Sequence, residues 1–166
     1  MRLYELKYEG YGATNPDPVV KVKQVSPFSP FVKGEKKSLK IFMLRILFYL
    51  QSKGDFRIYY VADAPSGRVI HTSYVTGPGS KFPFMEKGDL HIGPCFTDPA
   101  YRGQGIYRTV LRSIHGENCT RYNRVYMIVH EDNHPSIKGI EAAGLVCVGT
   151  VDRQGIRKIY RRVSDV

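Results

Sequence analysis

Residues 95–108 constrain the fold more than any other segment, because a strand pattern there ends in a glycine-bearing loop that opens a helix. The first N–H groups of a helix have no partner inside it, and the helix dipole favours an anion at that end. Gly103 and Gly105 let the backbone turn sharply and approach a ligand. Arg102 and Arg108 add positive charge at the same place. The segment therefore predicts an α/β unit with a phosphate site at the helix start.

Hydrophobic periodicity predicts the other elements. Strands are expected at 3–9, 19–25, 56–62, 69–75, 89–97, 124–129, 145–151 and 156–161, with helices at 38–54, from 106 onward, and from 133 to 144. Gly93-Pro94 predicts a bulge or an edge inside the strand at 89–97, since proline cannot donate to a ladder. The continuous apolar run at 124–129 indicates a strand buried on both faces. The expected class is a mixed α/β domain with one central sheet.

Composition limits the kind of protein. The chain has 166 residues and 42% hydrophobic residues, which fits one globular domain. Its longest apolar run, 41–50, contains Arg45 and is shorter than the roughly 20 residues of a membrane span. The first residues lack the apolar stretch of a secretory signal, so we expect a cytoplasmic location. Three cysteines without a Cys-x-x-Cys pair predict neither a disulfide framework nor a zinc knuckle.

The formal net charge of +10 predicts an anionic partner. Nucleic acid, an acidic lipid surface or a polyphosphate cofactor would each satisfy this charge. The basic residues are spread over 21–23, 33–40, 102–112 and 153–162. No arginine-rich run is interleaved with aromatic residues, so we do not expect a nucleic-acid partner.

Two glycines alone would indicate only a tight turn into a helix, and neither Gly-x-Gly-x-x-Gly nor Gly-Lys-Ser/Thr is present. Residues 102–106, however, resemble the Arg/Gln-x-x-Gly-x-Gly/Ala pyrophosphate loop of the GNAT N-acetyltransferase superfamily. Asn133 and Ser136, followed by residues 143–145, are similar to the second signature of that family. The order of strands, loops and helices also agrees over residues 56–151. One departure is Tyr107, which stands where the family has glycine or alanine.

The resemblance implies a GNAT-like acyl-CoA N-acyltransferase fold. Its central twisted sheet is mostly antiparallel, is flanked by helices, and is splayed between the family's fourth and fifth strands, which match 89–97 and 124–129 here. We expect a single domain over 1–166, with its core at 38–162 and variable strands at 1–35. The implied cosubstrate is acetyl-CoA. The positions matching its site are Phe96, Thr97, Arg102, Gly103, Gln104, Gly105, Ile106, Tyr107, Arg108, Asn133 and Ser136.

The resemblance also implies direct attack of a primary amine on the thioester, without a covalent enzyme intermediate. The backbone N–H of Cys95 is the expected oxyanion donor. Many family members carry a basic glutamate four residues earlier, where this chain has His91. An ordinary histidine pKa near 6.5 suits a base at neutral pH. Glu86 and Asp89 are alternative bases, and a hydrogen-bonded strand histidine is the structural alternative for His91.

The tyrosine that usually protonates the leaving thiolate is absent, because Ile140 occupies its position. Tyr107, Tyr126, His134 or solvent remain open as substitutes. Cys95 could instead accept the acyl group as a nucleophile. No third orienting residue is evident for that role, so a small buried apolar side chain is the preferred interpretation.

Residues 130–134 match His-Glu-x-x-His, the zinc-protease pattern. That chemistry needs both histidines one turn apart on a helix. A buried strand leads directly into His130, and Pro135 marks a helix that begins after the motif. We therefore expect no metal.

Acceptor sites are built from loops and the variable first half, so the acceptor is the open question. Residues 77–88, with Phe82, Phe84 and Met85, are either an acceptor-side lid or an apolar loop folded onto the core. The expected partner is a small-molecule amine. Similarity of residues 91–107 to acetyltransferases of surface-polysaccharide synthesis favours a nucleotide-linked amino sugar.

The alternative is a non-catalytic CoA- or nucleic-acid-binding module on the same fold. The substituted positions Ile140 and Tyr107 favour it. Whether the chain forms a homodimer is left open by the sequence.

Overall fold

The computed structural model describes residues 1–7, 21–25, 28, 39–52, 55–155 and 159–165, and every statement below refers to these residues. The elements are β1 (Arg2–Lys7), β2 (Val22–Val25), α1 (Leu39–Gln51), β3 (Phe56–Ala62), β4 (Val69–Thr76), β5 (Asp89–Thr97), the 3-10 turn η1 (Pro99–Tyr101), α2 (Ile106–Asn118), β6 (Arg124–Val129), α3 (His134–Ala142), β7 (Val146–Gln154) and β8 (Ile159–Asp165). The predicted strand ends at 8–9 and 19–20 and the basic segment 33–38 lie outside the described residues.

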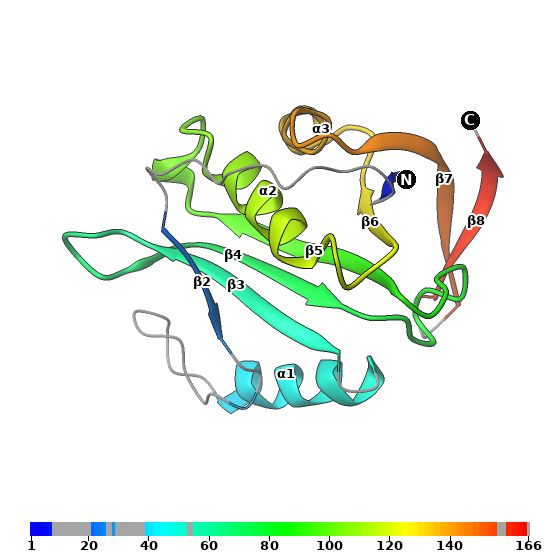
Figure 1. Ribbon diagram of the computed structural model, residues 1–166, viewed down its shortest axis with the longest axis horizontal. Coiled ribbons are helices and arrows are strands. Elements are labelled where there is room, and N and C mark those ends of the chain that lie inside the picture. Colours follow the sequence, from blue (N-terminus) through cyan, green and yellow to red (C-terminus); the bar gives the residue numbers. More distant parts are fainter. Residues whose placement is uncertain (8–20, 26–27, 29–38, 53–54, 156–158, 166) are drawn as a thin grey trace.

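The eight strands form one sheet in the order β2-β3-β4-β5-β6-β1-β7-β8. Only β5 and β6 are parallel, and all other neighbours are antiparallel. Helices α2 and α3 lie on one side of the sheet and α1 lies on the other (Figure 1). The predicted mixed α/β class with a mostly antiparallel sheet is confirmed.

The main core lies between the sheet and α2. The helix presents one apolar face, whose members Ile106, Val110, Leu111 and Ile114 are all buried. They pack in one cluster with strand side chains that include Val125 of β6. Burying such a face is what stabilises a helix of this length against a sheet. None of the described helices is long and apolar enough to cross a bilayer.

Helix α1 differs from its prediction. Spacings of three and four predict an inward face made of Leu39, Phe42, Met43, Ile46, Leu47 and Leu50. Four of these six, Leu39, Met43, Leu47 and Leu50, are exposed, whereas Arg45 is buried. The segment is apolar on nearly every side, so spacings of three and four do not single out one inward face. The helix itself was predicted correctly, but its orientation was not.

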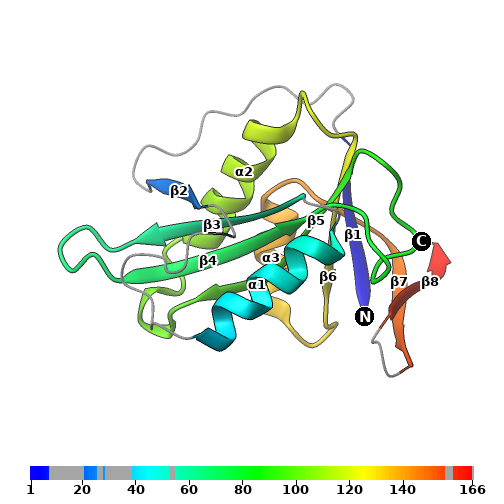
Figure 2. The same cartoon turned by 90° about the horizontal axis from the view of Figure 1, so that it is seen from below.

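Strand β1 is an interior strand, the sixth of the eight in the sheet. Figure 2 shows it running between β6 and β7, and it pairs antiparallel with both. Arg2 is opposite Val129 on one side and Thr150 on the other. Met1 extends the ladder, since its carbonyl accepts from Val151 N at 2.8 Å. The sequence predicted this strand but gave no indication of its central place.

The closing hairpin is longer than predicted. Residues 152–154 were expected in the turn, but β7 continues to Gln154, which pairs with Ile159. Only Gly155, with φ of 67°, matches the expected turn. Strands of an exposed edge hairpin can pair even where their side chains are polar. The prediction placed the strand end too early because it took the polar residues 152–154 for a turn.

Candidate functional site

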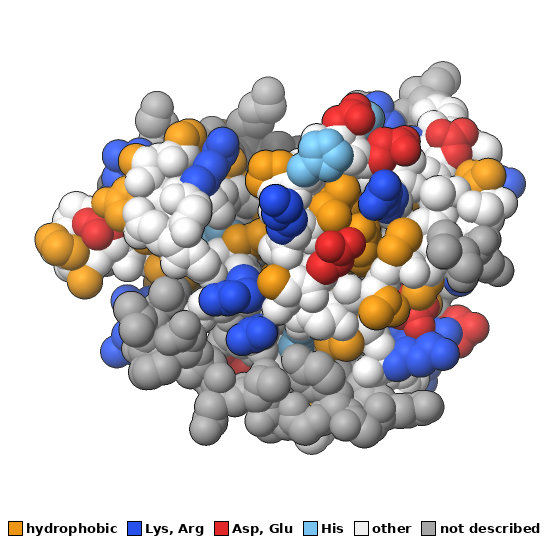
Figure 3. Space-filling model, turned by 90° about the horizontal axis from the view of Figure 1, so that it is seen from above, with side chains coloured by type: hydrophobic (Ala, Val, Ile, Leu, Met, Phe, Trp, Pro, Cys, Tyr) orange, Lys and Arg blue, Asp and Glu red, His pale blue; other side chains and the backbone are white. Residues whose placement is uncertain are grey.

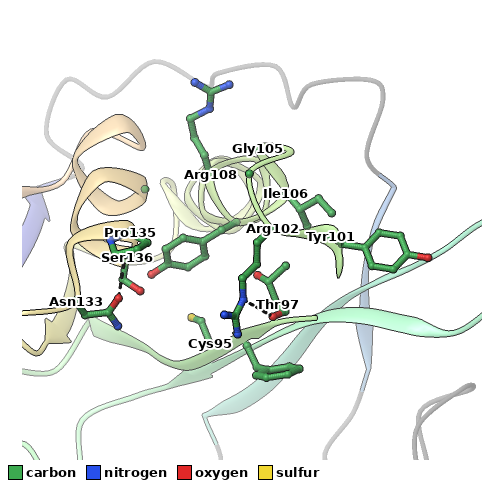
Figure 4. Close-up of a pocket in the computed structure, with 14 residues that line it drawn as sticks. Cys95, Thr97, Tyr101, Arg102, Gly105, Ile106, Arg108, Asn133, Pro135 and Ser136 are labelled. Atoms are coloured by element: carbon green, nitrogen blue, oxygen red, sulfur yellow. Dashed lines mark hydrogen bonds between the residues drawn. The ribbon is translucent and has the colours of Figure 1, made fainter. Parts of the chain in front are cut away.

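A groove of about 480 Å³ opens where β5 ends and α2 begins. Its wall is formed by the end of β5, the loop into α2, and the first turns of α2 and α3 (Figure 4). It is lined by Cys95, Phe96, Thr97, Tyr101, Arg102, Gly103, Gly105, Ile106, Tyr107, Arg108, Asn133, Pro135, Ser136 and Gly139. We call this the cofactor groove. Of the eleven residues predicted for the cofactor site, only Gln104 does not line it, and its side chain turns back to the carbonyl of Ala100 at 3.5 Å.

The loop into α2 exposes backbone donors. Gly103 and Gly105 both adopt φ of 77°, a left-handed conformation that favours glycine. Gly105 is the N-cap of α2, and as a glycine it has no side chain that could accept from the first N–H groups of the helix. The first helical bond runs from Thr109 N to Gly105 O at 3.0 Å. The N–H groups of residues 106–108 therefore have no acceptor within the helix and face the end where its dipole favours an anion.

One arginine reaches across the groove. Arg102 Nε donates to the carbonyl oxygen of Thr97 at 3.2 Å, and its side chain crosses the groove, whereas Arg108 points away from it (Figure 4). Seen from the α2 and α3 side, Lys and Arg side chains are interspersed with apolar and acidic ones and do not gather in one block (Figure 3). Positive charge is therefore supplied at the loop itself and not by a broad basic patch on this face.

The second predicted signature forms the opposite wall. The Asn133 side chain caps α3 by accepting from Ser136 N at 3.3 Å, and Pro135 lies in the first turn. On the inner side of α3, Gly139 leaves room for the ring of Tyr107, because a Cβ there would lie 2.6 Å from Tyr107 Cδ1. The neighbouring Ile140 is buried in the core. The α2 tyrosine thus fills the space beside the position where the resemblance expects a tyrosine on α3.

Strands β5 and β6 separate beside the groove. They pair over only three residue pairs, ending at His91 opposite Tyr126. Beyond that point β5 continues along β4, with a bulge where two steps along β4 match three along β5. The bulge contains Gly93 and Pro94, as predicted. The predicted splay between these two strands is present.

The bulge decides which side chains face the groove. Paired residues of neighbouring strands point to the same face of a sheet. Val75 and Ile92 are paired and pack in the core beneath α2, so Cys95 and its partner Ser73 face that side as well. His91 pairs with Thr76 on the opposite face. His91 and Cys95 are therefore on opposite faces of the same strand.

Cys95 lies on the floor of the cofactor groove (Figure 4). Burial raises the pKa of its thiol to about 11, while hydrogen bonds with Ser73 and Tyr107 act to lower it. Burial also raises the pKa of Tyr107, and its bond with Cys95 adds to that rise. Both side chains therefore keep their protons at neutral pH.

Sequence reasoning missed two buried polar residues behind the groove. His71 Nε2 is 2.8 Å from Ser73 Oγ, and His71 Nδ1 is 2.7 Å from Thr97 Oγ1. Ser73 Oγ in turn donates to Cys95 Sγ at 3.2 Å. The sequence did contain a signal for these residues. His71 and Ser73 occupy alternate positions of β4, on a face whose other members are apolar, and such a polar pair on a buried face indicates a hydrogen-bonded network.

A second, smaller cavity of about 30 Å³ lies on the His91 face of the sheet. We call it the acceptor pocket, after the role that we propose for it below, and it is lined by Ser52, Thr76, Gly77, Gly79, Lys81, Phe82, His91, Gly93 and Pro94. The His91 ring stacks on Phe82 with centroids 4.1 Å apart. Among the described residues, neither His91 Nδ1 nor Thr76 Oγ1 has a hydrogen-bond partner. Burial, with the charge of Lys81, lowers the pKa of His91 to about 3, well below the ordinary value used above.

Residues 77–88 line one side of this pocket and pack against the protein core. Phe82 and Met85 are buried in a cluster with Leu3. Glu86 and Asp89, considered as alternative bases, are both paired with Arg124, whose Nε lies 2.9 Å from the fully buried Asp89 Oδ1. The segment is thus folded onto the core, and the carboxylates of Glu86 and of Asp89, the first residue of β5, are held in ion pairs.

The His-Glu-x-x-His pattern does not lie on one helix. His130 follows the end of β6, and α3 begins only at His134. His130 Nδ1 contacts Asp132 at 3.3 Å on the surface. In the part of the chain that the structure describes, no group of three or more potential metal ligands comes together.

No protein-family model matches this sequence. No curated protein matches it at a significant level. Solved structures, in contrast, share its fold. A GCN5-related N-acetyltransferase from Sphaerobacter thermophilus superposes with a TM-score of 0.62 at 15% identity, over 88% of this chain and 47% of that one.

Two further structures show the same architecture. A tandem GNAT protein from the clavulanic acid biosynthesis pathway gives a TM-score of 0.57 at 14% identity, over 87% of this chain and 49% of its own. An aminoglycoside antibiotic 6'-N-acetyltransferase from Acinetobacter baumannii gives 0.54 at 11% identity, over 75% and 89%. The chain spans about half the length of the first two proteins. At these identities the likeness concerns the fold, and on that basis this chain has the fold of the GNAT N-acetyltransferases.

Proposed function

We propose that this protein transfers an acetyl group from acetyl-CoA to a primary amine of a small molecule. The observation that carries the proposal is the cofactor groove, in which N–H groups at the start of α2 that have no acceptor inside the helix open beside the splay of β5 and β6. The diphosphate would bind at residues 102–106. Phe96 and Thr97 would flank the arm that leads the thioester to Cys95.

In this proposal the two faces of the sheet divide the substrates between them. Acetyl-CoA occupies the groove on the α2 side, and the amine enters from the side of the acceptor pocket. The bulge at Gly93 and Pro94 lies between the two cavities. Past it, the N–H of Cys95 is our proposed donor to the developing oxyanion.

His91 is the proposed acceptor-side residue. A pKa of about 3 is too low for it to take a proton from an alkylammonium ion, whose ordinary pKa is about 10. The neutral ring can, however, accept a hydrogen bond and so select the unprotonated amine. Thr76 Oγ1 offers a second polar contact in the same pocket. Direct attack by that amine on the thioester then needs no covalent enzyme intermediate.

The acceptor class rests on charge and on the fold relatives. One of these, an aminoglycoside acetyltransferase from an uncultured soil sample, was solved in complex with sisomicin. The net charge of +10 favours an acceptor that carries negative charge of its own. We therefore place amino sugars, nucleotide-linked ones first, at the head of the acceptor panel.

Binding tests come before turnover. Acetyl-CoA should raise the thermal unfolding midpoint, whereas a DNA oligonucleotide should not at either of two salt concentrations. Arg102→Gln should weaken acetyl-CoA binding by roughly 10-fold or more, as expected when a charged hydrogen bond is lost. Arg153→Gln is the matched control, because Arg153 is exposed on β7 away from the groove. Equal affinity in both variants would contradict the proposed diphosphate site.

Turnover is measured as thiol release from acetyl-CoA across a panel of amines, amino sugars and peptides. His91→Ala should lower the rate with the best acceptor by roughly 10-fold, as expected when one neutral hydrogen bond that orients the amine is lost. Acetyl-CoA binding without thiol release for every acceptor would support the non-catalytic binding module instead.

A further inference from the structure

A chain of hydrogen bonds runs behind the cofactor groove and returns to it. It leads from Thr97 through His71 and Ser73 to Cys95, over 2.7, 2.8 and 3.2 Å, and Tyr107 bonds to the same sulfur. Both ends, Thr97 and the Cys95–Tyr107 pair, line the groove. The middle is sealed, with His71 and Ser73 at 1% and 0% exposure.

This network lies on a face of β4 that packs against the apolar core. The same face of β4 continues with Val75, which is fully buried in the apolar core. A polar group buried there costs about 1–3 kcal/mol unless it is hydrogen-bonded. Every side-chain polar atom of His71 and Ser73 has a partner, so the network is complete. In such a chain the direction of one hydrogen bond sets the direction of the next.

Only one arrangement of protons lets Ser73 donate to the sulfur. The Ser73 oxygen then accepts from His71 Nε2–H, and the unprotonated Nδ1 accepts from the Thr97 hydroxyl. Burial lowers the pKa of His71 to about 4, so the ring stays neutral, and the direction of the Ser73–Cys95 bond then places its proton on Nε2. The sulfur of Cys95 receives hydroxyl protons from Ser73 and Tyr107, and its own S–H is left to point elsewhere.

We propose that Cys95 donates its proton to the thiolate that leaves acetyl-CoA, and that His71 is the positioning residue that keeps the Ser73 hydroxyl aimed at the sulfur. This inference rests on the function proposed above. The S–H bond of Cys95 breaks as the S–H bond of CoA forms. The resulting Cys95 thiolate is held by the hydroxyls of Ser73 and Tyr107. Once CoA leaves, it regains a proton from water, which has taken up the proton that the amine lost.

The Cys95 thiol and the thiol of CoA have similar acidities when both lie in the cofactor groove. Burial raises the pKa of Cys95 to about 11, so the thiol does not ionise before the reaction. A CoA thiolate expelled into the same groove also loses water, which raises its basicity in the same way. Proton transfer between two sulfurs that share one environment is therefore feasible, and Ile140 leaves no tyrosine on α3 to do it.

The first test compares Cys95→Ala with Cys119→Ala. Cys119 is also half-buried, and within the described part of the chain its sulfur bonds to the carbonyl of Gly116 at 3.3 Å, so it is the matched control. With acetyl-CoA, Cys95→Ala should lower kcat by roughly 10²-fold, as for loss of a general acid, and leave KM and the thermal unfolding midpoint near those of Cys119→Ala. With an acetyl thioester of an acidic aryl thiol, which leaves without a proton, the loss should be much smaller. Equal losses with both thioesters would overturn the proposal.

The second test separates positioning from mere packing. In His71→Gln the side-chain amide can still donate to Ser73 and accept from Thr97, whereas in His71→Phe it cannot. His71→Gln should stay within a few-fold of wild type in kcat, and His71→Phe should lose roughly 10-fold or more with acetyl-CoA at unchanged acetyl-CoA affinity. Equal kcat values for the two variants would remove His71 from this role.

Two further outcomes are decisive. Mass spectrometry of the acid-quenched reaction should find no acetyl group on Cys95. An acetylated Cys95 would make it an acyl carrier and overturn its role as proton donor. If wild-type protein releases no thiol with any amine, the proposed function itself fails, and that result is distinct from normal turnover in Cys95→Ala.

Discussion

The contact between Gly139 and Tyr107 permits a quantitative test of how the groove is packed. In Gly139→Ala the new Cβ would lie 2.6 Å from Tyr107 Cδ1 and 3.0 Å from Cε1, so the ring must move. Alanine in a helix interior stabilises by about 1 kcal/mol relative to glycine. Overpacking of this kind costs about 1–3 kcal/mol. The free energy of unfolding should therefore fall by about 0–2 kcal/mol.

Removing the ring should reverse the sign of the effect. In a Tyr107→Ala background the added methyl meets no aromatic carbon, so the same substitution should stabilise by about 1 kcal/mol. Urea denaturation of the four proteins gives the coupling energy, which we expect at about 1–3 kcal/mol with an unchanged m-value. The same change in unfolding free energy in both backgrounds would show that the ring does not occupy this space.

Three more predictions concern buried ionisable groups. Asp89→Asn should lower the free energy of unfolding by about 3 kcal/mol, because it removes the charge of a fully buried carboxylate and leaves Arg124 without a charged partner there. Glu86→Gln changes an exposed pair and should cost less than about 1 kcal/mol in the same denaturation assay. Cys95, with its pKa raised to about 11, should react with iodoacetamide at pH 8 about 10²-fold more slowly than a thiol of ordinary pKa. Peptide mass spectrometry measures this alkylation rate, and a rate equal to that of an ordinary thiol would contradict the burial of Cys95. His71 and His91 have pKa values lowered by burial from 6.5 to about 4 and 3, so below pH 6.5 the unfolded chain binds protons that the folded chain does not. Each should make stability fall by up to about 1.4 kcal/mol per pH unit from pH 6 towards pH 4, and a pH-independent difference between wild type and His71→Gln would refute this.

The parts of the site that sequence reasoning located are those set by local backbone physics. Glycines at 103 and 105 before an apolar helix, and Asn133 before Pro135, act within a few residues of themselves. Their positions along the groove follow once a strand, loop and helix are joined in that order. Hence ten of the eleven predicted cofactor residues line one groove.

The missed residues depend on contacts between strands. His71 and Ser73 reach the groove only because a bulge in the neighbouring strand brings Cys95 onto their face. The sequence indicated the bulge at Gly93-Pro94, but it did not say which strand would lie alongside or in which register. The same limit applies to the pKa of His91, which depends on Phe82 and Lys81 folding over it from a loop.

The central place of β1 has a consequence for how the chain reaches its final state. The strand precedes all other described elements along the chain, yet both of its neighbours come from the last third of the sequence. Within the described pairs, β1 is also the sole link between the β7–β8 hairpin and the rest of the sheet. Closing such long loops makes folding slow. An added segment or deletion at residues 2–7 should therefore impair the assembly of the distant hairpin before it affects the groove between β5 and α2.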